Sequence, residues 1–229
     1  MEYQNNDIFR DDIYQQLARI GKIVGHPKRI ELLEILCQGE RPVDSLAATT
    51  GLQMTTASAH LQVMRQARLV ETRRDGTRIY YRVAGVEVCQ FVKALSDLGR
   101  ARLAEIEQIL REIEIGSHST ELVSRQELLG RVKRGDTVVI DVRPSEEYQA
   151  GHIPGALSLP LELLEARLDE IEPNQNVVAY CRGPLCLLAP QAVAILRKRG
   201  INAQRLEEGM PEWRHAGLPV AVGIQPGSI

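Results

Sequence analysis

A short run of small polar residues at positions 116–120 separates two halves of the chain that follow different hydrophobic patterns. The run reads Gly-Ser-His-Ser-Thr, a composition typical of loops. Before it, apolar residues recur at the spacing of amphipathic helices, and beyond it strand-like runs alternate with helical ones. A chain of 229 residues is long enough for two domains. We therefore expect one domain over 1–112, a linker over 113–121 and a second domain over 122–229.

The composition is that of an ordinary globular protein. Hydrophobic residues make up 44% of the chain and charged residues 25%, which argues against extended disorder. No apolar run approaches the roughly 18 residues that span a membrane, and the polar start lacks a secretory signal. We expect a cytoplasmic protein with no membrane partner, and no sequence pattern indicates a cofactor.

The first half carries the signals of a mainly helical domain. Gly25-His26-Pro27 separates two helical patterns, and Pro27 suits the first turn of the second. Two short helical segments follow, 42–49 and 55–67, with Gly51-Leu52 as the turn between them. This arrangement is typical of a helix-turn-helix. Its second helix is expected to bury Ala57, Leu61 and Met64.

A hairpin and a long helix complete this half. Strand-like runs at 69–73 and 78–83 flank Asp75-Gly76, a pair favoured in tight turns. A hairpin directly after a helix-turn-helix is a wing. Apolar residues then recur at helical spacing over 86–113, which predicts one long helix. That helix would pair with a second copy of the chain, with the chain's own first helix, or with both.

Arginines cluster around the predicted wing. Six of them fall within 18 positions, namely Arg65, Arg68, Arg73, Arg74, Arg78 and Arg82. The first 112 residues carry 16 basic and 15 acidic side chains, whereas the remainder carries 12 and 15. The cluster is either an electrostatic footprint for phosphate or a solvated arginine face, and charge alone leaves both open.

The order and identity of these segments resemble the ArsR family of small bacterial repressors over about residues 10–112. The matching residues are Gly25 to Leu33, Leu46-Ala47, Gly51-Leu52, Ser58 to Arg65, Leu69-Val70 and Gly76 to Arg82. The resemblance implies a winged helix-turn-helix that reads DNA. The family's usual metal sites are missing, because residues 41–46 hold no cysteine and the last helix holds no histidine. We therefore expect no metal.

The second helix of such a motif lies in the major groove of double-stranded DNA, and the wing contacts the backbone. The expected contacts are Thr55, Thr56, Ser58, Ala59, His60, Gln62 and Arg65 on the helix, with Arg73, Arg74 and Arg78 on the wing. Hydroxyl and amide groups can bond to base edges or phosphates. His60 is equally consistent with a base contact and with packing between helices. The predicted partners are operator DNA and a second copy of the chain, joined through the first and last helices.

A cysteine follows the strongest strand of the second half. Cys181 comes directly after the buried run 176–180, and a helix begins a few residues later. Ligands bind at the carboxyl ends of strands in open α/β sheets. The free N–H groups of a helix start stabilise an anion, so the pattern predicts a lowered thiol pKa and a nucleophilic Cys181.

Four separated motifs in this half resemble the rhodanese family over about residues 120–225. They are Asp141 to Pro144, Glu147-Tyr148 with Gly151 to Ala156, Tyr180 to Cys186, and Gly209 to Trp213 with Gly217 to Val220. The resemblance implies an α/β domain with a parallel sheet, in which Cys181 takes sulfur from a persulfide, polysulfide or thiosulfate donor and passes it on. The expected site is Cys181, Arg182, Cys186, Asp141 and Arg143, with His152 in a structural role.

The cysteine loop departs from the usual rhodanese pattern. Gly183 comes one position early, Pro184 removes an amide donor, and Cys186 occupies the sixth position. These differences question ordinary thiosulfate turnover and leave a catalytically silent fold open. Cys186 either resolves a Cys181 persulfide into a disulfide or fills space beneath the loop.

The first half holds two further cysteines, Cys37 and Cys89. Some ArsR relatives link a cysteine of the second helix to one of the last helix when they sense persulfides. Neither cysteine here falls at the position that aligns with that pair, so we interpret both first as small buried residues, with sensing as the alternative.

Three functions follow. The preferred one is a DNA-binding regulator, a repressor in the first instance, whose operator affinity depends on sulfur chemistry at Cys181. The alternatives are a sulfurtransferase with an accessory DNA-binding domain and a repressor that senses through Cys37 and Cys89.

Overall fold

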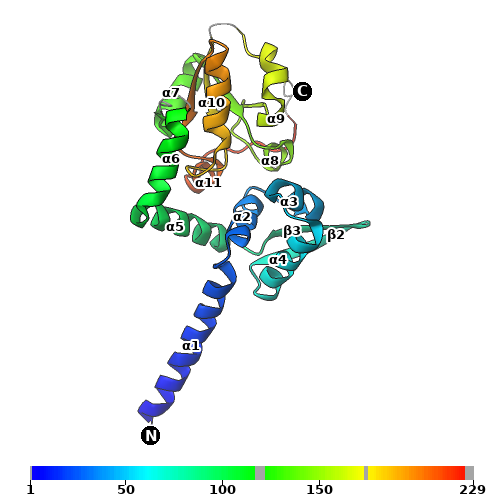
Figure 1. Ribbon diagram of the computed structural model, residues 1–229, viewed down its shortest axis with the longest axis vertical. Coiled ribbons are helices and arrows are strands. Elements are labelled where there is room, and N and C mark those ends of the chain that lie inside the picture. Colours follow the sequence, from blue (N-terminus) through cyan, green and yellow to red (C-terminus); the bar gives the residue numbers. More distant parts are fainter. Residues whose placement is uncertain (1, 117–121, 173–174, 225–229) are drawn as a thin grey trace. The chain divides into compact units, whose positions relative to one another are not determined.

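The computed structural model describes residues 2–116, 122–172 and 175–224, and the side chains of residues 9–112, 122–172 and 175–224 (Figure 1). The chain divides into two compact units, 1–92 and 93–229, so the division falls inside a helix. The predicted linker, 113–121, begins within the last turn of a helix, and its residues 117–121 lie outside the described ranges. The predicted domain boundary stays a prediction. No helix in the described ranges has both the length and the apolar character needed to cross a membrane.

The first unit is helical with a small antiparallel sheet. Its elements are α1 (Glu2–Val24), α2 (Pro27–Leu36), β1 (Arg41–Pro42), α3 (Val43–Thr50), α4 (Met54–Gln66), β2 (Val70–Asp75) and β3 (Arg78–Val83), followed by the start of α5 (Val86–Arg102). The strand order is β1-β3-β2. This is the winged helix-turn-helix that the sequence predicted.

Two sequence features form the helix-turn-helix: a glycine that ends its first helix and an apolar stripe that buries one side of its second. Gly51 takes a φ of +65° directly after α3, a conformation that favours glycine, and so ends that helix. On α4, Ala57, Leu61 and Met64 are completely buried against the core of the unit. The predicted apolar stripe of the second helix is therefore confirmed.

The wing differs from the prediction in two details. Asp75 pairs with Arg78, so the turn consists of Gly76 and Thr77, one position later than expected, and Gly76 takes a φ of +58°. The strand β1 was not predicted, because it has two residues and one of them is proline. It exists only because the fold brings Arg41 beside Tyr81, a residue far away in the sequence.

The prediction of one long helix over 86–113 is wrong. The chain turns sharply at Leu103 between α5 and α6 (Ala104–Gly116), as Figure 1 shows. Gly99 makes the turn feasible, because Cδ1 of Ile106 lies 3.1 Å from the position that a Cβ atom would occupy. An ion pair of 3.1 Å between Arg100 and Glu107 crosses the break.

The remaining elements form an α/β domain. They are β4 (Leu122–Val123), α7 (Arg125–Arg134), β5 (Thr137–Asp141), α8 (Ser145–Ala150), β6 (Leu157–Ser158), α9 (Leu161–Leu164) with a 3-10 helix (Glu165–Glu170), β7 (Asn176–Tyr180), α10 (Leu188–Lys198), β8 (Asn202–Leu206) and α11 (Met210–His215). The five strands are parallel in the order β4-β8-β7-β5-β6. The predicted parallel sheet is confirmed.

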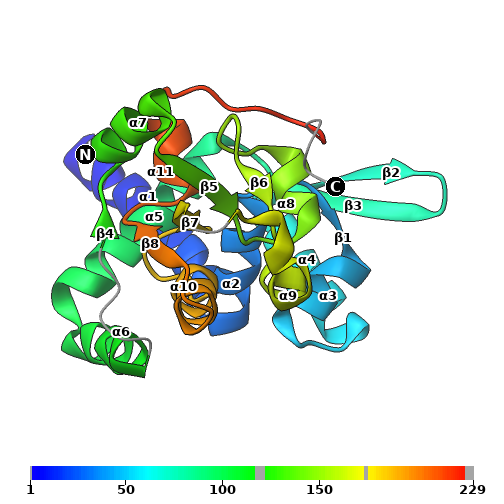
Figure 2. The ribbon, with the colours of Figure 1, turned by 90° about the horizontal axis from the view of Figure 1, so that it is seen from above.

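Helices cover both faces of this sheet, and the strands lie between them in Figure 2. One core joins the sheet to α9 and α10 and includes Leu164, Val193 and Leu196. The other joins it to α7 and α11 through Leu128 and Trp213. Because β7 lies in the middle of the sheet, the residue that follows it is held from both sides.

Candidate functional site

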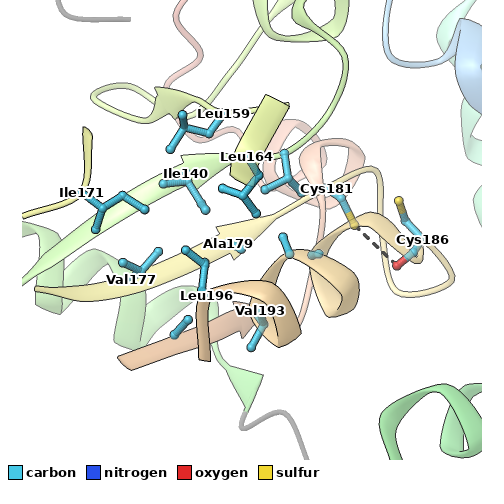
Figure 3. Packing of buried hydrophobic residues seen from close by; sticks show 14 residues of the cluster. Ile140, Leu159, Leu164, Ile171, Val177, Ala179, Cys181, Cys186, Val193 and Leu196 are labelled. Atoms are coloured by element: carbon cyan, nitrogen blue, oxygen red, sulfur yellow. Dashed lines mark hydrogen bonds between the residues drawn. The ribbon is translucent and has the colours of Figure 1, made fainter. Parts of the chain in front are cut away.

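Cys181 lies at the carboxyl end of β7, where the chain enters the loop that leads to α10 (Figure 3). Two backbone bonds shape this loop. The Cys186 amide donates to the Gly183 carbonyl at 3.0 Å, and the Met210 amide donates to the Cys181 carbonyl at 3.2 Å. The loop is therefore fixed by its own turn and by the start of α11.

Cys181 and Cys186 are both free thiols and both buried. The Cys181 sulfur lies 3.6 Å from the Cys186 carbonyl oxygen, the contact dashed in Figure 3, and 3.8 Å from the Gly183 carbonyl oxygen. The structure thus brings the two predicted sulfur-handling cysteines into contact.

The expected lowering of the Cys181 pKa is wrong. Burial raises the pKa of the Cys181 thiol, and the neighbouring Cys186 raises it further, although amides of Gly183 and of Ala189 at the start of α10 oppose this. The pKa of Cys186 is lowered instead, chiefly because the Cys181 thiol donates a hydrogen bond to it. The amide of Ala189 at the helix start lowers the pKa of Cys181 as expected, but burial outweighs it.

A buried network of hydrogen-bonded groups lies beside the strand end that leads into the cysteine loop. Arg143 donates to both carboxylate oxygens of Asp141, at 2.6 Å for the closest contact, and neither side chain is exposed. The Tyr180 hydroxyl donates to Asp141 at 2.6 Å and accepts from the Ile153 amide at 3.1 Å. Asp141 and Arg143 therefore reach the loop through Tyr180, the residue directly before Cys181.

A second ion pair holds the loop itself. Arg182 makes three hydrogen bonds of 2.7–3.1 Å to the carboxylate of Glu147, which is completely buried on α8. The Arg182 charge and amide lower the pKa of Cys186. Sequence reasoning did not assign Glu147 or Tyr180 to the site, although both stand within the motifs that carried the rhodanese resemblance.

His152 is completely buried and stacks on Tyr148, with ring centroids 3.6 Å apart. Its Nδ1 lies 2.8 Å from the Tyr148 carbonyl oxygen. These contacts hold α8 and the following turn together, and they agree with the expected structural role.

The predicted DNA-reading residues of α4 lie on its outer side. Thr55, Thr56, Ala59 and Arg65 are exposed, whereas Ser58, His60 and Gln62 are half-buried. Gln62 donates to the Tyr81 hydroxyl of the wing at 3.3 Å. His60 lies against His26, with ring centroids 4.5 Å apart, which favours the packing interpretation. Burial and the nearby His26 and Arg29 lower the pKa of His60.

The three predicted wing arginines are exposed but differ in their partners. Arg73 is bound to Glu40 at 2.8 Å and to Asp75 at 3.1 Å. Arg74 donates to the Gly76 carbonyl within the turn, at 3.1 Å, and Arg78 stands at the hairpin end. Sequence reasoning did not identify Glu40, because it lies 33 positions from its partner.

Cys37 and Cys89 form a disulfide, with their Cα atoms 5.6 Å apart. Cys37 directly follows α2, and Cys89 lies in the first turns of α5. The interpretation of two separate buried thiols is therefore wrong. Among the residues that the structure describes, no group of three or more His, Cys, Asp or Glu side chains is placed to hold a metal ion.

Known proteins match both units. Residues 26–72 match the family described as "Bacterial regulatory protein, arsR family", and residues 124–216 match the rhodanese-like domain. The HTH-type transcriptional regulator Rv0324 of Mycobacterium tuberculosis is 44% identical over 94% of each chain. A protein named "Sulfurtransferase" from Allochromatium vinosum is 36% identical over 37% of this chain and 78% of its own.

Among solved structures, a homodimeric winged helix-turn-helix domain of Mb0332 from Mycobacterium bovis is 40% identical. It covers 41% of this chain and 87% of its own, with a TM-score of 0.39. The relative from M. tuberculosis matches along nearly the whole length of both chains, across the winged helix-turn-helix and the rhodanese-like domain alike. The chain therefore belongs to the ArsR family of bacterial regulatory proteins, in a form that carries a rhodanese-like domain behind its DNA-binding motif.

Proposed function

We propose that the chain is a DNA-binding transcriptional repressor whose operator affinity depends on sulfane sulfur taken up at Cys181. The observation that carries this proposal is a pair of free cysteines, Cys181 and Cys186, at the strand end of the rhodanese-like domain, where the Cys181 sulfur contacts the Cys186 carbonyl oxygen. A chain that both reads DNA and holds such a site can link gene expression to the supply of reactive sulfur.

The chemistry needs two balanced steps. The Cys181 thiolate attacks the outer sulfur of a persulfide or polysulfide, which forms a Cys181 persulfide and releases the donor's thiolate. The Cys186 thiolate then attacks the inner sulfur of that persulfide, forms a Cys181–Cys186 disulfide and expels hydrosulfide. Cys186 suits the second step because the amides of Leu188 and Arg182 and the Arg182 charge also lower its pKa, independently of the Cys181 thiol, and because Cys181 is its neighbour.

Operator binding would use the outer side of α4 and the wing. Thr55, Thr56 and Arg65 are exposed there and can reach base edges and phosphates. The reduced and the sulfur-modified protein must bind DNA with different affinities. A modification that leaves the affinity unchanged cannot shift the equilibrium between free and bound operator.

A homodimer would cover an apolar stripe that α1 exposes. Phe9, Ile13, Tyr14 and Leu17 are each 57–61% exposed, and Ile20 continues the stripe toward the core of the unit. Exposed apolar residues at this helical spacing are typical of a subunit interface. We infer that the partner is a second copy of the chain, as the operators of such motifs are read by symmetric dimers.

The test compares four forms of the full chain on DNA from the gene's own promoter region. Reduced, polysulfide-treated and peroxide-treated protein are measured beside Cys181→Ser. We expect treated wild-type protein to bind differently from reduced protein, and Cys181→Ser not to respond. Equal affinity in all four forms would contradict sensing at Cys181. Steady sulfur turnover that is lost in Cys181→Ser and indifferent to DNA would identify a sulfurtransferase instead.

The Cys37–Cys89 disulfide favours a second candidate, in which the DNA-binding unit itself carries the sulfur switch. Mass spectrometry of polysulfide-treated protein separates the two candidates. A Cys181–Cys186 link supports the first. A cross-link confined to Cys37 and Cys89 supports the second and contradicts the first.

A further inference from the structure

Arg73 on the wing has three partners from its own chain, two carboxylates and an aromatic ring. Its Nε and Nη2 donate to the carboxylate of Glu40 at 2.8–3.3 Å, and its Nη1 donates to Asp75 at 3.1 Å. The guanidinium also lies over the ring of Tyr80, 4.8 Å from its centroid. The paired, forked contact with Glu40 has the geometry with which arginine binds a phosphate.

Glu40 is held in place from both ends of a short segment. Three residues before it, Cys37 is bonded to Cys89 on α5. One residue after it, Arg41 pairs with Tyr81 in β3, is 2% exposed, and donates to Ser45 at 3.2 Å. The segment 37–41 is therefore fixed at Cys37 by the disulfide and at Arg41 by its pairing with the wing strand β3.

We propose that Glu40 competes with DNA phosphate for the wing arginine Arg73, and that the Cys37–Cys89 bond keeps Glu40 in the competing position. The proposal rests on the proposed function in one respect, that the wing contacts DNA. Reduction by an external dithiol delivers two electrons and two protons, gives two thiols and converts the dithiol to its own disulfide. The segment around Glu40 then gains freedom, and Arg73 exchanges the carboxylate for phosphate more readily.

The energetics allow a switch of modest size. Both side chains are partly exposed, 47% for Arg73 and 27% for Glu40, and such pairs contribute little in water. Phosphate can therefore displace Glu40 without unfolding the wing. Removing the Glu40 carboxylate frees Nε and Nη2 of Arg73 for the DNA backbone while Nη1 keeps Asp75. Each phosphate contact steepens the salt dependence of binding.

The experiment measures binding of the full chain to a mixed-sequence DNA duplex across a range of salt concentrations, since backbone contacts carry no sequence information. We expect Glu40→Gln to bind about two- to fivefold more tightly at low salt. The slope of log K against log salt should steepen by roughly 0.9. Asp97→Asn is the matched control, because it makes the same change of charge in an exposed pair with Lys93 that belongs to the second unit and shares no partner with Arg73.

Further variants decide the mechanism. In an Arg73→Gln background, Glu40→Gln should have no effect. Reduced wild-type protein and Cys37→Ser/Cys89→Ser should both move toward the Glu40→Gln values. Equal gains in Glu40→Gln and Asp97→Asn, or a gain that persists without Arg73, would overturn the competition. No response to reduction would overturn the role of the disulfide. A wild-type chain that binds no duplex at any salt would contradict the proposed function itself.

Discussion

At the scale of single residues, the rhodanese-like domain buries a small group of paired charges beside the cysteine loop. Asp141, Arg143 and Glu147 are completely buried, and Arg182 closes the group at the loop. Charges so enclosed are tolerated only when each has a partner. Acidic and basic residues therefore stand close together at the end of β5 and directly after it, where they pair with one another. The loop is held in place by these residues, although none of them is a cysteine.

Replacing Arg143 with alanine should destabilise the second unit strongly. The change leaves Asp141 without its ion pair and removes one charge near Glu147, at a cost of about 3–5 kcal/mol. Urea unfolding followed by the fluorescence of Trp213, the chain's single tryptophan, measures it. Arg134→Ala is the control, because its pair with Asp136 is exposed and should contribute little. Similar losses in both variants would contradict the importance of burial.

Cys186 should be alkylated at lower pH than Cys181. Its pKa is lowered because the Cys181 thiol donates to it, whereas burial raises the pKa of Cys181. Cys181→Ala removes the donor, so the pKa of Cys186 should rise and its alkylation should shift to higher pH. Mass spectrometry across a pH series assigns each modified cysteine. A profile for Cys186 that is the same with and without Cys181 would speak against the contact.

At the scale of elements, close approaches decide the shape of the loop. Gly209 precedes α11, and a Cβ atom there would lie 2.3 Å from the Gly183 nitrogen and 2.4 Å from the Arg182 carbonyl carbon. Real atoms do not approach so closely, and these are backbone atoms that cannot rotate away. The start of α11 and the cysteine loop therefore fit together only because residue 209 has no side chain.

Gly209→Ala should displace the cysteine loop and slow persulfide formation at Cys181, with a loss of about 1–3 kcal/mol of stability from overpacking. Gly130→Ala is the matched substitution, since its Cβ would meet only a flexible Arg134 side chain at 3.5 Å within α7. That change should leave sulfur uptake unaltered and raise stability slightly. Sulfur uptake measured by mass spectrometry distinguishes the two, and equal uptake in both would refute the contact.

The elements were predictable to different degrees. The helix-turn-helix and the parallel sheet follow from apolar spacing that each segment carries by itself. The break between α5 and α6 does not, because residues 86–113 keep helical spacing throughout, and the turn depends on Ile106 packing over Gly99. The strand β1 was equally hidden, since a two-residue strand needs a partner before it exists.

At the scale of the whole molecule, the chain consists of two units with separate cores, and only the first contains a disulfide. The Cys37–Cys89 bond closes a loop across 52 positions. In the chain-entropy account such a closure contributes about 4 kcal/mol by restricting the unfolded chain. The cysteines of the second unit are free thiols, so a reductant has no bond to break there.

A reducing agent should therefore destabilise the first unit alone. In urea, the far-ultraviolet circular dichroism should show an earlier transition after reduction, while the transition reported by Trp213 in the second unit stays in place. Cys37→Ser/Cys89→Ser should match the reduced protein and no longer respond to reductant. An equal shift of the Trp213 transition would show that the two units unfold together.

The sequence by itself determined the two-part organisation, both folds, the buried face of α4 and the place of Cys181 at the end of a buried strand, because these depend on periodicity and on motifs short enough to read along the chain. Only the tertiary structure decided which groups meet. It joined Cys37 to Cys89 and Glu40 to Arg73. It also raised the pKa of Cys181 where the pattern had predicted a lowered one. The physical reason is the same in each case, since contact and burial depend on distances in space that no local pattern encodes.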